Sequence, residues 1–207
     1  MYTSPVKLRE EGIMGLAVKK SEQQPAHWVH IQCTVGSKVS VRVGGDQLVY
    51  DPQSNSPSWN LLLIAGGIGI NPLFSVLNHV CDYYRGKDSI NYKPGSVELL
   101  YSASEPKELI FKESISEMVK TYPGQLASRY FVTRAVGGCD TKDLSDVVIE
   151  RRISQSDIQE SLQRLKKLKN DSILCLVCGP PPMIDSMEQI LQQQGIPKGS
   201  IMAEKWW

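Results

Sequence analysis

The sequence predicts an α/β protein built on a five-stranded, doubly wound parallel sheet. From residue 60 onward, short and almost purely apolar runs alternate with longer segments of helical spacing. The loops after the first and fourth of these runs are rich in glycine and proline. Parallel neighbours need a crossover helix, and strands covered by helices on both faces are apolar throughout. These observations together predict the fold class.

Residues 1–50 have a different character and predict antiparallel sheet. The candidate strands are Ile13 to Lys19 and Val39 to Val43, and the second alternates apolar and polar residues. Residues 51–60, DPQSNSPSWN, gather Pro, Ser and Asn, which indicates a linker. We therefore expect a chain of two parts, 1–55 and 56–207.

Five strands are expected in the second part, because each is a short apolar run bounded by turn residues. They are Asn60 to Ala65, Val97 to Ala103, Ala127 to Thr133, Ser172 to Cys178 and Ser200 to Glu204. With right-handed crossovers the expected strand order is 3-2-1-4-5. The first and fourth strands then lie side by side, and a ligand is expected at their carboxyl ends.

Helices are expected between these strands, where apolar residues recur at helical spacing. They are Pro72 to Arg85, Glu105 to Tyr122, Thr141 to Val148, Ser154 to Lys169 and Pro181 to Gln194. Gly195 follows the last helix as its C-terminal cap.

Composition argues against several kinds of partner. Lys and Arg number 23 against 22 Asp and Glu, so the net charge of +1 offers no basic surface for nucleic acid. The longest apolar run, Leu61 to Ile70, has about half the length that spans a bilayer, so no membrane span is expected. The start, MYTSPVKLREEG, resembles no targeting segment, and we expect none in this chain. Five scattered cysteines argue for a reducing compartment.

The glycine loop AGGIGINP after the first strand is a candidate nucleotide site. Gly66, Gly67 and Gly69 allow the backbone to approach a ligand, and Asn71 and Pro72 can begin the next helix. A helix N-terminus offers amide donors to a pyrophosphate. A tight turn in which glycine only permits packing stays open, because G-G-x-G-x-x-P departs from G-x-G-x-x-G.

The second candidate loop is LVCGPPPM, after the fourth strand. Cys178 lies where its side chain could contact a ligand, or it is a buried structural thiol. Cys175 and Cys178 form a C-x-x-C, but residues three apart on a strand point to opposite faces, so we predict no metal site there. His27, His30 and His79 have no metal-ligand spacing either.

Taken in order, AGGIGINP, YSASEPKELIF, CGPPPM and the final E-K-W-W resemble the ferredoxin:NADP reductase superfamily. The resemblance extends over essentially all 207 residues. It implies an antiparallel flavin barrel followed by an α/β nicotinamide domain, with electron transfer by hydride from NAD(P)H to a flavin such as FAD. We therefore expect a partial flavin-type barrel in residues 1–55 and an NAD(P)-binding domain in residues 56–207. The resemblance also implies a mitochondrial location.

The same resemblance implies which residues bind the cofactors. The glycine loop contributes Gly66, Gly67, Ile68, Gly69, Ile70, Asn71 and Pro72. The loop after the fourth strand contributes Cys178, Gly179, Pro180 and Met183, with Cys178 as the catalytic residue that positions the nicotinamide. The adenosine ribose or its phosphate meets Tyr101, Ser102, the helix start Pro106 to Leu109, Thr133 and Arg134. Trp207, or Trp206, covers the flavin, unless both tryptophans form a buried hydrophobic plug.

The barrel part departs from the family pattern. Only Thr3, Ser4 and Pro5 remain of the flavin-binding signature R-x-Y-S-x-x-S, and His27 stands near the place of a diphosphate-binding serine. Gly44 and Gly45 keep the family's glycine turn. We expect an N-terminally truncated flavin site that holds FAD weakly or not at all.

The predicted function is an NAD(P)H-dependent flavoprotein oxidoreductase whose electron acceptor, a protein or a small molecule, is not identified. The alternative is a nucleotide-binding or interaction module without turnover, because a fold does not fix a function. Glu105 as a partner for ribose hydroxyls favours NAD, whereas Lys107 and Arg134 are candidates for the 2′-phosphate of NADP.

Overall fold

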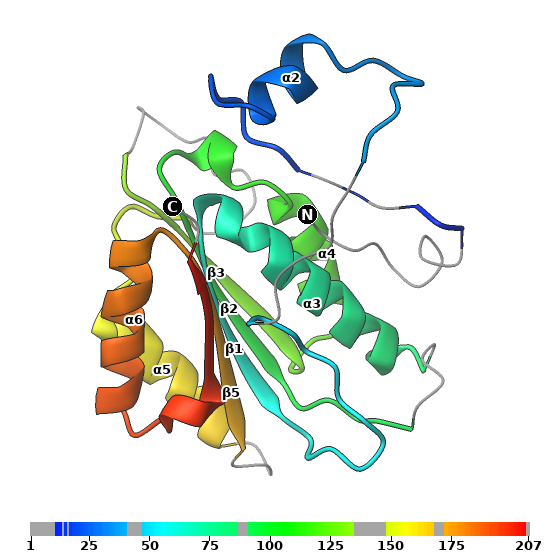
Figure 1. Ribbon diagram of the computed structural model, residues 1–207. Coiled ribbons are helices and arrows are strands. Elements are labelled where there is room, and N and C mark those ends of the chain that lie inside the picture. Colours follow the sequence, from blue (N-terminus) through cyan, green and yellow to red (C-terminus); the bar gives the residue numbers. More distant parts are fainter. Residues whose placement is uncertain are drawn as a thin grey trace.

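A parallel sheet between two layers of helices forms the body of the protein (Figure 1). The computed structural model describes residues 11–13, 15, 17–40, 47–86, 91–134, 148–167 and 172–205. The strands are β1 (Asn60–Gly66), β2 (Val97–Ala103), β3 (Leu126–Val132), β4 (Val148–Ile149), β5 (Ile173–Gly179) and β6 (Ile201–Lys205). Their order in the sheet is β4-β3-β2-β1-β5-β6.

The predicted strand order is confirmed, but the sheet has six strands rather than five. The additional strand, β4, pairs only two residues with Tyr130 and Phe131 of β3, which is too short to leave an apolar pattern. A helix was expected up to Val148. Residues 141–147 lie outside the described residues, and Val148 itself belongs to β4.

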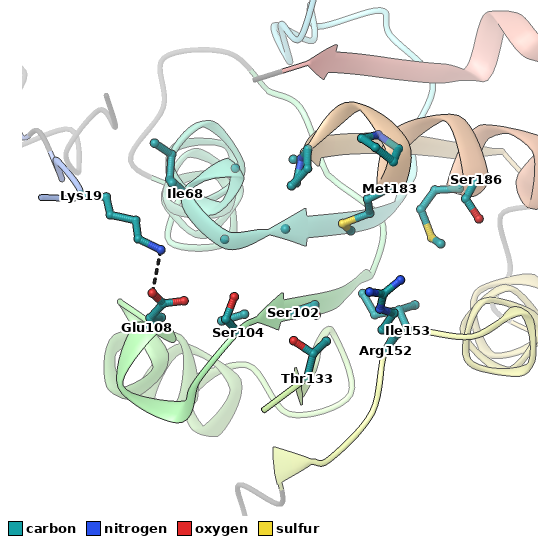
Figure 2. Close-up of a pocket in the computed structure, with 18 residues that line it drawn as sticks. Lys19, Ile68, Ser102, Ser104, Glu108, Thr133, Arg152, Ile153, Met183 and Ser186 are labelled. Atoms are coloured by element: carbon teal, nitrogen blue, oxygen red, sulfur yellow. Dashed lines mark hydrogen bonds and ion pairs between the residues drawn. The ribbon is translucent and has the colours of Figure 1, made fainter. Parts of the chain in front are cut away.

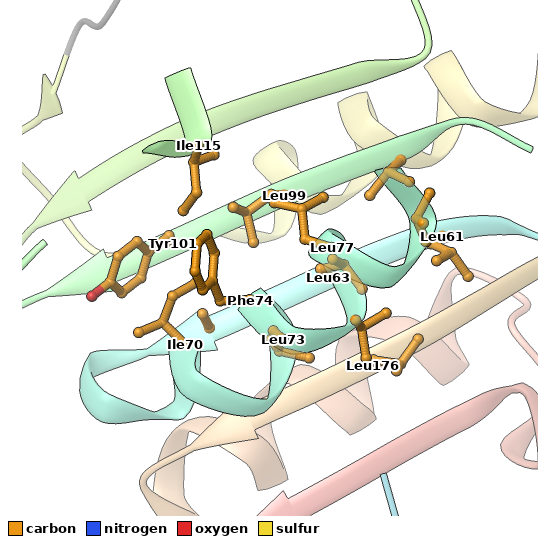
Figure 3. Close-up of a cluster of buried hydrophobic side chains, with 14 of the residues drawn as sticks. Leu61, Leu63, Ile70, Leu73, Phe74, Leu77, Leu99, Tyr101, Ile115 and Leu176 are labelled. Carbon is orange, nitrogen blue, oxygen red and sulfur yellow. The ribbon is translucent and has the colours of Figure 1, made fainter. Parts of the chain in front are cut away.

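Helices cover both faces of the sheet, as predicted. Helices α3 (Ile70–Tyr84) and α4 (Lys112–Thr121) lie on one face, and α5 (Gln155–Lys166) and α6 (Pro181–Gln193) lie on the other (Figure 1). The fully buried strand β1 supplies both cores, because alternate side chains point to opposite faces. Figure 3 shows the first core, where Leu63 lies with Leu73 and Leu77 of α3. On the opposite face, Leu62 packs with residues of α5 and α6.

The helix expected over Glu105 to Tyr122 is interrupted. A single 3-10 turn (Pro106–Glu108) comes first, and α4 begins only at Lys112. Between them Phe111 has a φ of 64°, a left-handed conformation that an α-helix does not accommodate. The Phe111 ring stacks on Phe74 of α3 with ring centroids 4.2 Å apart, so packing against α3 accompanies the break.

The last two helices are capped by flanking residues, of which only Gly195 was predicted. Ser154 and Asp157 form a reciprocal capping box at the start of α5. Gly195, with a φ of 82°, follows α6 in the left-handed conformation expected of a C-terminal cap. Within the part of the chain that the structure describes, no helix is both long and apolar enough to cross a membrane.

The antiparallel sheet expected in the N-terminal part is not confirmed by its described residues. Its described residues contain α2 (Ala26–Ile31), and among the described residues of 13–19 only Gly15 takes part in a strand-like bridge. Val39 and Ser40 are not in a strand, and residues 41–43, like Gly44 and Gly45, lie outside the described residues. A short alternating run becomes a strand only beside a partner strand, and the described residues of 11–59 provide none. The partial barrel is therefore not seen there.

Candidate functional site

A cavity of about 530 Å³ lies at the carboxyl ends of β1, β2, β3 and β5 (Figure 2). Parallel α/β sheets bind ligands at this edge, where the strand order reverses between β1 and β5. The cavity is lined by Lys19, Gly66, Gly67, Ile68, Gly69, Ser102, Ala103, Ser104, Glu108, Thr133, Arg152, Ile153, Gly179, Pro180, Pro182, Met183, Ser186 and Met187.

Gly67 is the glycine that leaves room for a ligand. It begins the single 3-10 turn Gly67–Gly69 that joins β1 to α3, and its φ is 53°. A Cβ atom at this position would meet no atom of the protein within 4 Å. A side chain here would be strained and would extend into open space beside the cavity, so glycine keeps both the turn and the space.

The other glycines of the two loops serve loop packing. A Cβ atom on Gly69 would overlap the carbonyl group of Cys178, and one on Gly66 would overlap the Sδ atom of Met183. A Cβ atom on Gly179 would lie 3.1 Å from the Cα atom of Gly66. The β1 and β5 loops thus touch through their backbones. The packing interpretation of the glycine motif therefore applies to Gly66, Gly69 and Gly179, and the ligand-binding interpretation stays a prediction for Gly67.

Asn71 lies in the first turn of α3 rather than at its N-cap, and it is buried with 2% of its surface exposed. Its Nδ2 atom donates to the carbonyl oxygens of Ile68 at 3.1 Å and Ala17 at 3.3 Å. Asn71 therefore connects the glycine loop to the N-terminal segment.

Lys19 of that segment reaches one end of the cavity. Its Nζ atom donates to Oε1 of Glu108 at 2.6 Å, as Figure 2 shows. The hydrogen bond from Lys19 lowers the pKa of the Glu108 carboxyl group below its usual value. The buried Tyr101 donates its hydroxyl proton to the Glu108 carbonyl oxygen at 3.0 Å. This hydrogen bond helps to fix the turn that carries Glu108.

Arg152 and Ile153 enter the cavity from the loop between β4 and α5. Figure 2 places Arg152 on the same side of the cavity as Thr133, which follows β3, and Ser102, which lies near the end of β2. Arg151, the preceding residue, turns away and binds both carboxylate oxygens of the buried Asp157, at 2.5 and 2.9 Å. The sequence pattern does not point to Arg152, because the short strand β4, which brings its loop to the sheet edge, leaves no pattern of its own.

Nine of the cofactor-binding residues predicted individually line this cavity: Gly66, Gly67, Ile68, Gly69, Ser102, Thr133, Gly179, Pro180 and Met183. Glu108, from the predicted helix start Pro106 to Leu109, lines it as well. Six others do not line it: Ile70, Asn71, Pro72, Tyr101, Arg134 and Cys178. Trp207 lies outside the described residues. Sequence reasoning missed the side chains that reach the cavity from other segments, namely Lys19, Ala103, Ser104, Arg152, Ile153, Pro182, Ser186 and Met187.

Cys178 is fully buried and packs on the α3 side of β5, in the same cluster as Leu176. Cys175 is buried on the opposite side, as predicted for residues three apart on a strand. Burial raises the pKa of the Cys175 thiol to about 12. Among the described residues, no group of three or more His, Cys, Asp or Glu side chains could hold a metal ion. The catalytic role of Cys178 stays a prediction.

Known proteins resemble this chain in sequence and in fold. The family model of the oxidoreductase NAD-binding domain matches residues 63–189. A Danio rerio protein named oxidoreductase NAD-binding domain-containing protein 1 is 40% identical over 99% of this chain and 73% of its own length. The Homo sapiens protein of that name is 38% identical over 99% of this chain and 64% of its own length.

Several such relatives are longer than this chain, which spans 62% to 73% of their lengths. Among solved structures, the flavohem-like FAD/NAD binding domain of nitric oxide dioxygenase from Vibrio cholerae O1 biovar El Tor superimposes with a TM-score of 0.61. The match covers 91% of this chain and 69% of that one at 16% identity, and it shows a shared fold.

Proposed function

The chain belongs to the oxidoreductase NAD-binding domain family, and we propose that it binds a nicotinamide dinucleotide in the cavity at the carboxyl edge of its sheet and passes a hydride between this dinucleotide and a flavin. The observation that carries the proposal is the position of Gly67, whose missing side chain leaves open space beside the cavity at the turn into α3. Backbone of this kind at a helix start is suited to a pyrophosphate.

The other cavity residues fit the chemistry of a dinucleotide. Ser102, Ser104 and Thr133 place hydroxyl groups at the ends of β2 and β3, where they can bind ribose hydroxyls. Ile68, Pro180 and Met183 add apolar surface that excludes water from a planar ring. Arg152 supplies positive charge for phosphate groups, and Lys19 neutralises Glu108, the carboxylate that would otherwise repel them.

A bound nicotinamide supplies the hydride chemistry, and the protein contributes position and electrostatics. The β1 and β5 loops touch through Gly66, Gly69 and Gly179, so this part of the binding surface has a fixed shape. A binding surface that is already in place loses less conformational entropy when the ligand arrives.

The flavin half of the proposal rests on the family resemblance and on the Vibrio cholerae neighbour, whose title describes FAD and NAD binding. The described residues of 11–55 form α2 and turns, and no barrel strand that would hold a flavin is among them. The electron acceptor, the part of Trp207 in covering a flavin and the mitochondrial location stay predictions. The alternative of a nucleotide-binding or interaction module without turnover is not favoured, because the matching family model is that of an oxidoreductase domain.

Anaerobic mixing of the protein with FAD and then with NADH or NADPH tests this function. We expect saturable binding of a dinucleotide and loss of the oxidised flavin absorption band at a rate above that of free FAD. Binding without faster flavin reduction would limit the chain to dinucleotide binding. Absence of dinucleotide binding to the folded chain would contradict the proposal as a whole.

A further inference from the structure

We propose that Arg152 binds the 2′-phosphate of NADP(H), so that this chain prefers NADP(H) to NAD(H). This inference rests on the proposed function, because it concerns the same cavity. Arg152 lines the cavity, and its side chain is exposed. Among the ion pairs formed by the described residues, none includes Arg152.

The charges around the cavity explain why Arg152 differs from the other cations. Lys19 is neutralised by Glu108 at 2.6 Å, and the neighbouring Arg151 is neutralised by Asp157 at 2.5 Å. Arg152 is therefore the cavity-lining cation that the described part of the chain leaves without a carboxylate. Its positive charge is available to an anionic ligand.

The carboxylates are placed unfavourably for NAD. Sites that prefer NAD use an acidic side chain to bind the ribose 2′-hydroxyl group, whereas an arginine accommodates the 2′-phosphate of NADP. Glu108 is the carboxylate among the described lining residues, and it is paired with Lys19. Glu105, the acid that favoured NAD in the sequence, pairs with Lys107 at 2.7 Å and does not line the cavity.

Hydroxyl groups accompany Arg152. Thr133 and Ser102 line the same cavity, and Figure 2 places them on the side of Arg152. A phosphate monoester carries nearly two negative charges at neutral pH and accepts several hydrogen bonds. A guanidinium group can bind two phosphate oxygens at once while hydroxyl groups bind the third. Arg134, the other candidate for this phosphate, is exposed and does not line the cavity.

Hydrogen bonds made by neighbouring residues fix the backbone of the loop that carries Arg152. The backbone amide of Ser154 donates to Asp157 Oδ2 at 2.8 Å, and Arg151 Nη1 donates to the Arg152 carbonyl oxygen at 3.0 Å. Arg129 of β3 donates to the Asp157 carbonyl oxygen at 2.6 Å, which ties the start of α5 to the sheet. The Arg152 backbone is thus held in place before a ligand binds, which reduces the entropic cost of binding.

Calorimetric titration with 2′,5′-ADP and 5′-AMP tests the proposal without nicotinamide or flavin, because the two probes differ only in the 2′-phosphate. We expect the wild-type chain to bind 2′,5′-ADP about tenfold or more tightly than 5′-AMP, as a charge-assisted pair warrants. Arg152→Gln should remove that preference and leave the 5′-AMP affinity within about twofold, while Arg152→Lys should keep part of it. Arg85→Gln, at the far end of α3, is the matched control and should change neither affinity.

Equal binding of the two nucleotides by the wild-type chain would overturn the proposal. So would an equal loss for both nucleotides in Arg152→Gln, or a selective loss in Arg134→Gln instead. The same titrations with NADH and NADPH separate this inference from the proposed function. NADH binding without any preference for NADPH refutes only the role of Arg152, whereas absence of binding for both dinucleotides refutes both. Circular dichroism confirms that each variant is folded.

Discussion

The Nζ atom of Lys19 lies 2.6 Å from Oε1 of Glu108, and this ion pair joins segments 89 residues apart at one end of the cavity. The Asn71 side chain makes a second connection nearby, through the carbonyl oxygen of Ala17. The cavity is therefore not a property of the α/β sheet alone. A stretch before the sheet completes its wall and sets its charge.

Replacing Lys19 by methionine should weaken dinucleotide binding several-fold, because it leaves the Glu108 carboxylate unpaired beside the phosphates. The double variant Lys19→Met with Glu108→Gln should recover most of the affinity, since the repelling charge is gone. Stability should change by less than about 1 kcal/mol, because the Lys19 side chain is 59% exposed. Calorimetric titration of both variants measures the effect, and equal losses in the single and double variants would contradict it.

Gly67→Val should abolish dinucleotide binding, because the new side chain extends into the space beside the cavity. The left-handed φ of 53° also costs about 1 to 2 kcal/mol for a residue with a side chain. Gly195→Val is a matched control, since Gly195 has a φ of 82°, open space around it and a position beyond α6. Both variants should lose similar stability in thermal unfolding. Binding that persists in Gly67→Val would place the dinucleotide elsewhere.

The parallel sheet was predictable because its strands are buried on both faces. Runs such as LLLIA and ILCLVC are typical of a central parallel strand, and β1 and β5 follow them closely. The two-residue strand β4 has no such signature, since pairing with β3 and not local pattern creates it. The break at Phe111 was equally hidden, because its left-handed conformation accompanies a contact with Phe74 in another helix.

The candidate site likewise contains residues that the sequence predicted and residues that it did not. Residues within the two glycine loops were predicted, because each loop lies at the end of a recognisable strand. Lys19 and Arg152 were missed, since they reach the cavity from segments that the sheet does not specify locally. Tyr101 and Cys178 belong to the motifs but are buried and do not line the cavity, so the motif marks the loop and not every side chain in it.

Asp157→Asn should cost about 2 kcal/mol of unfolding free energy at neutral pH, because Arg151 loses its carboxylate partner and Arg129 keeps only its pair with Glu160. The hydrogen bonds from Arg151 hold the pKa of Asp157 well below its usual range in the folded protein. The unfolded value is about 3.9, so the contribution is complete above that pH and is lost as the pH falls below it.

Urea unfolding of the wild-type and Asp157→Asn proteins between neutral and acidic pH checks this prediction. The difference between the two should shrink below about pH 4. Asp185→Asn, which removes only the exposed pair with Lys205, is the control and should change stability by less than about 0.5 kcal/mol. A difference for Asp157→Asn that stays constant with pH would show that its charge does not stabilise the fold.

Cys178→Ala tests whether this residue positions the nicotinamide. If it does, flavin reduction should slow by about tenfold or more while the dinucleotide affinity stays within about twofold. Cys175→Ala is the matched control, because both thiols are fully buried but lie on opposite faces of β5. Stopped-flow reduction of both variants provides the comparison. Equal rates for the two would assign Cys178 to the core alone.

Hydrogen–deuterium exchange of the chain with and without NADPH tests most directly that the dinucleotide binds in this cavity. We predict slower exchange confined to peptides that contain Lys19, Gly66 to Gly69, Ser102 to Glu108, Thr133, Arg152 and Ile153, and Gly179 to Met187, which contribute its walls. Peptides at the opposite edge, such as those around Arg85 and Gly195, should be unchanged. Protection elsewhere, or none at saturating dinucleotide, would contradict it.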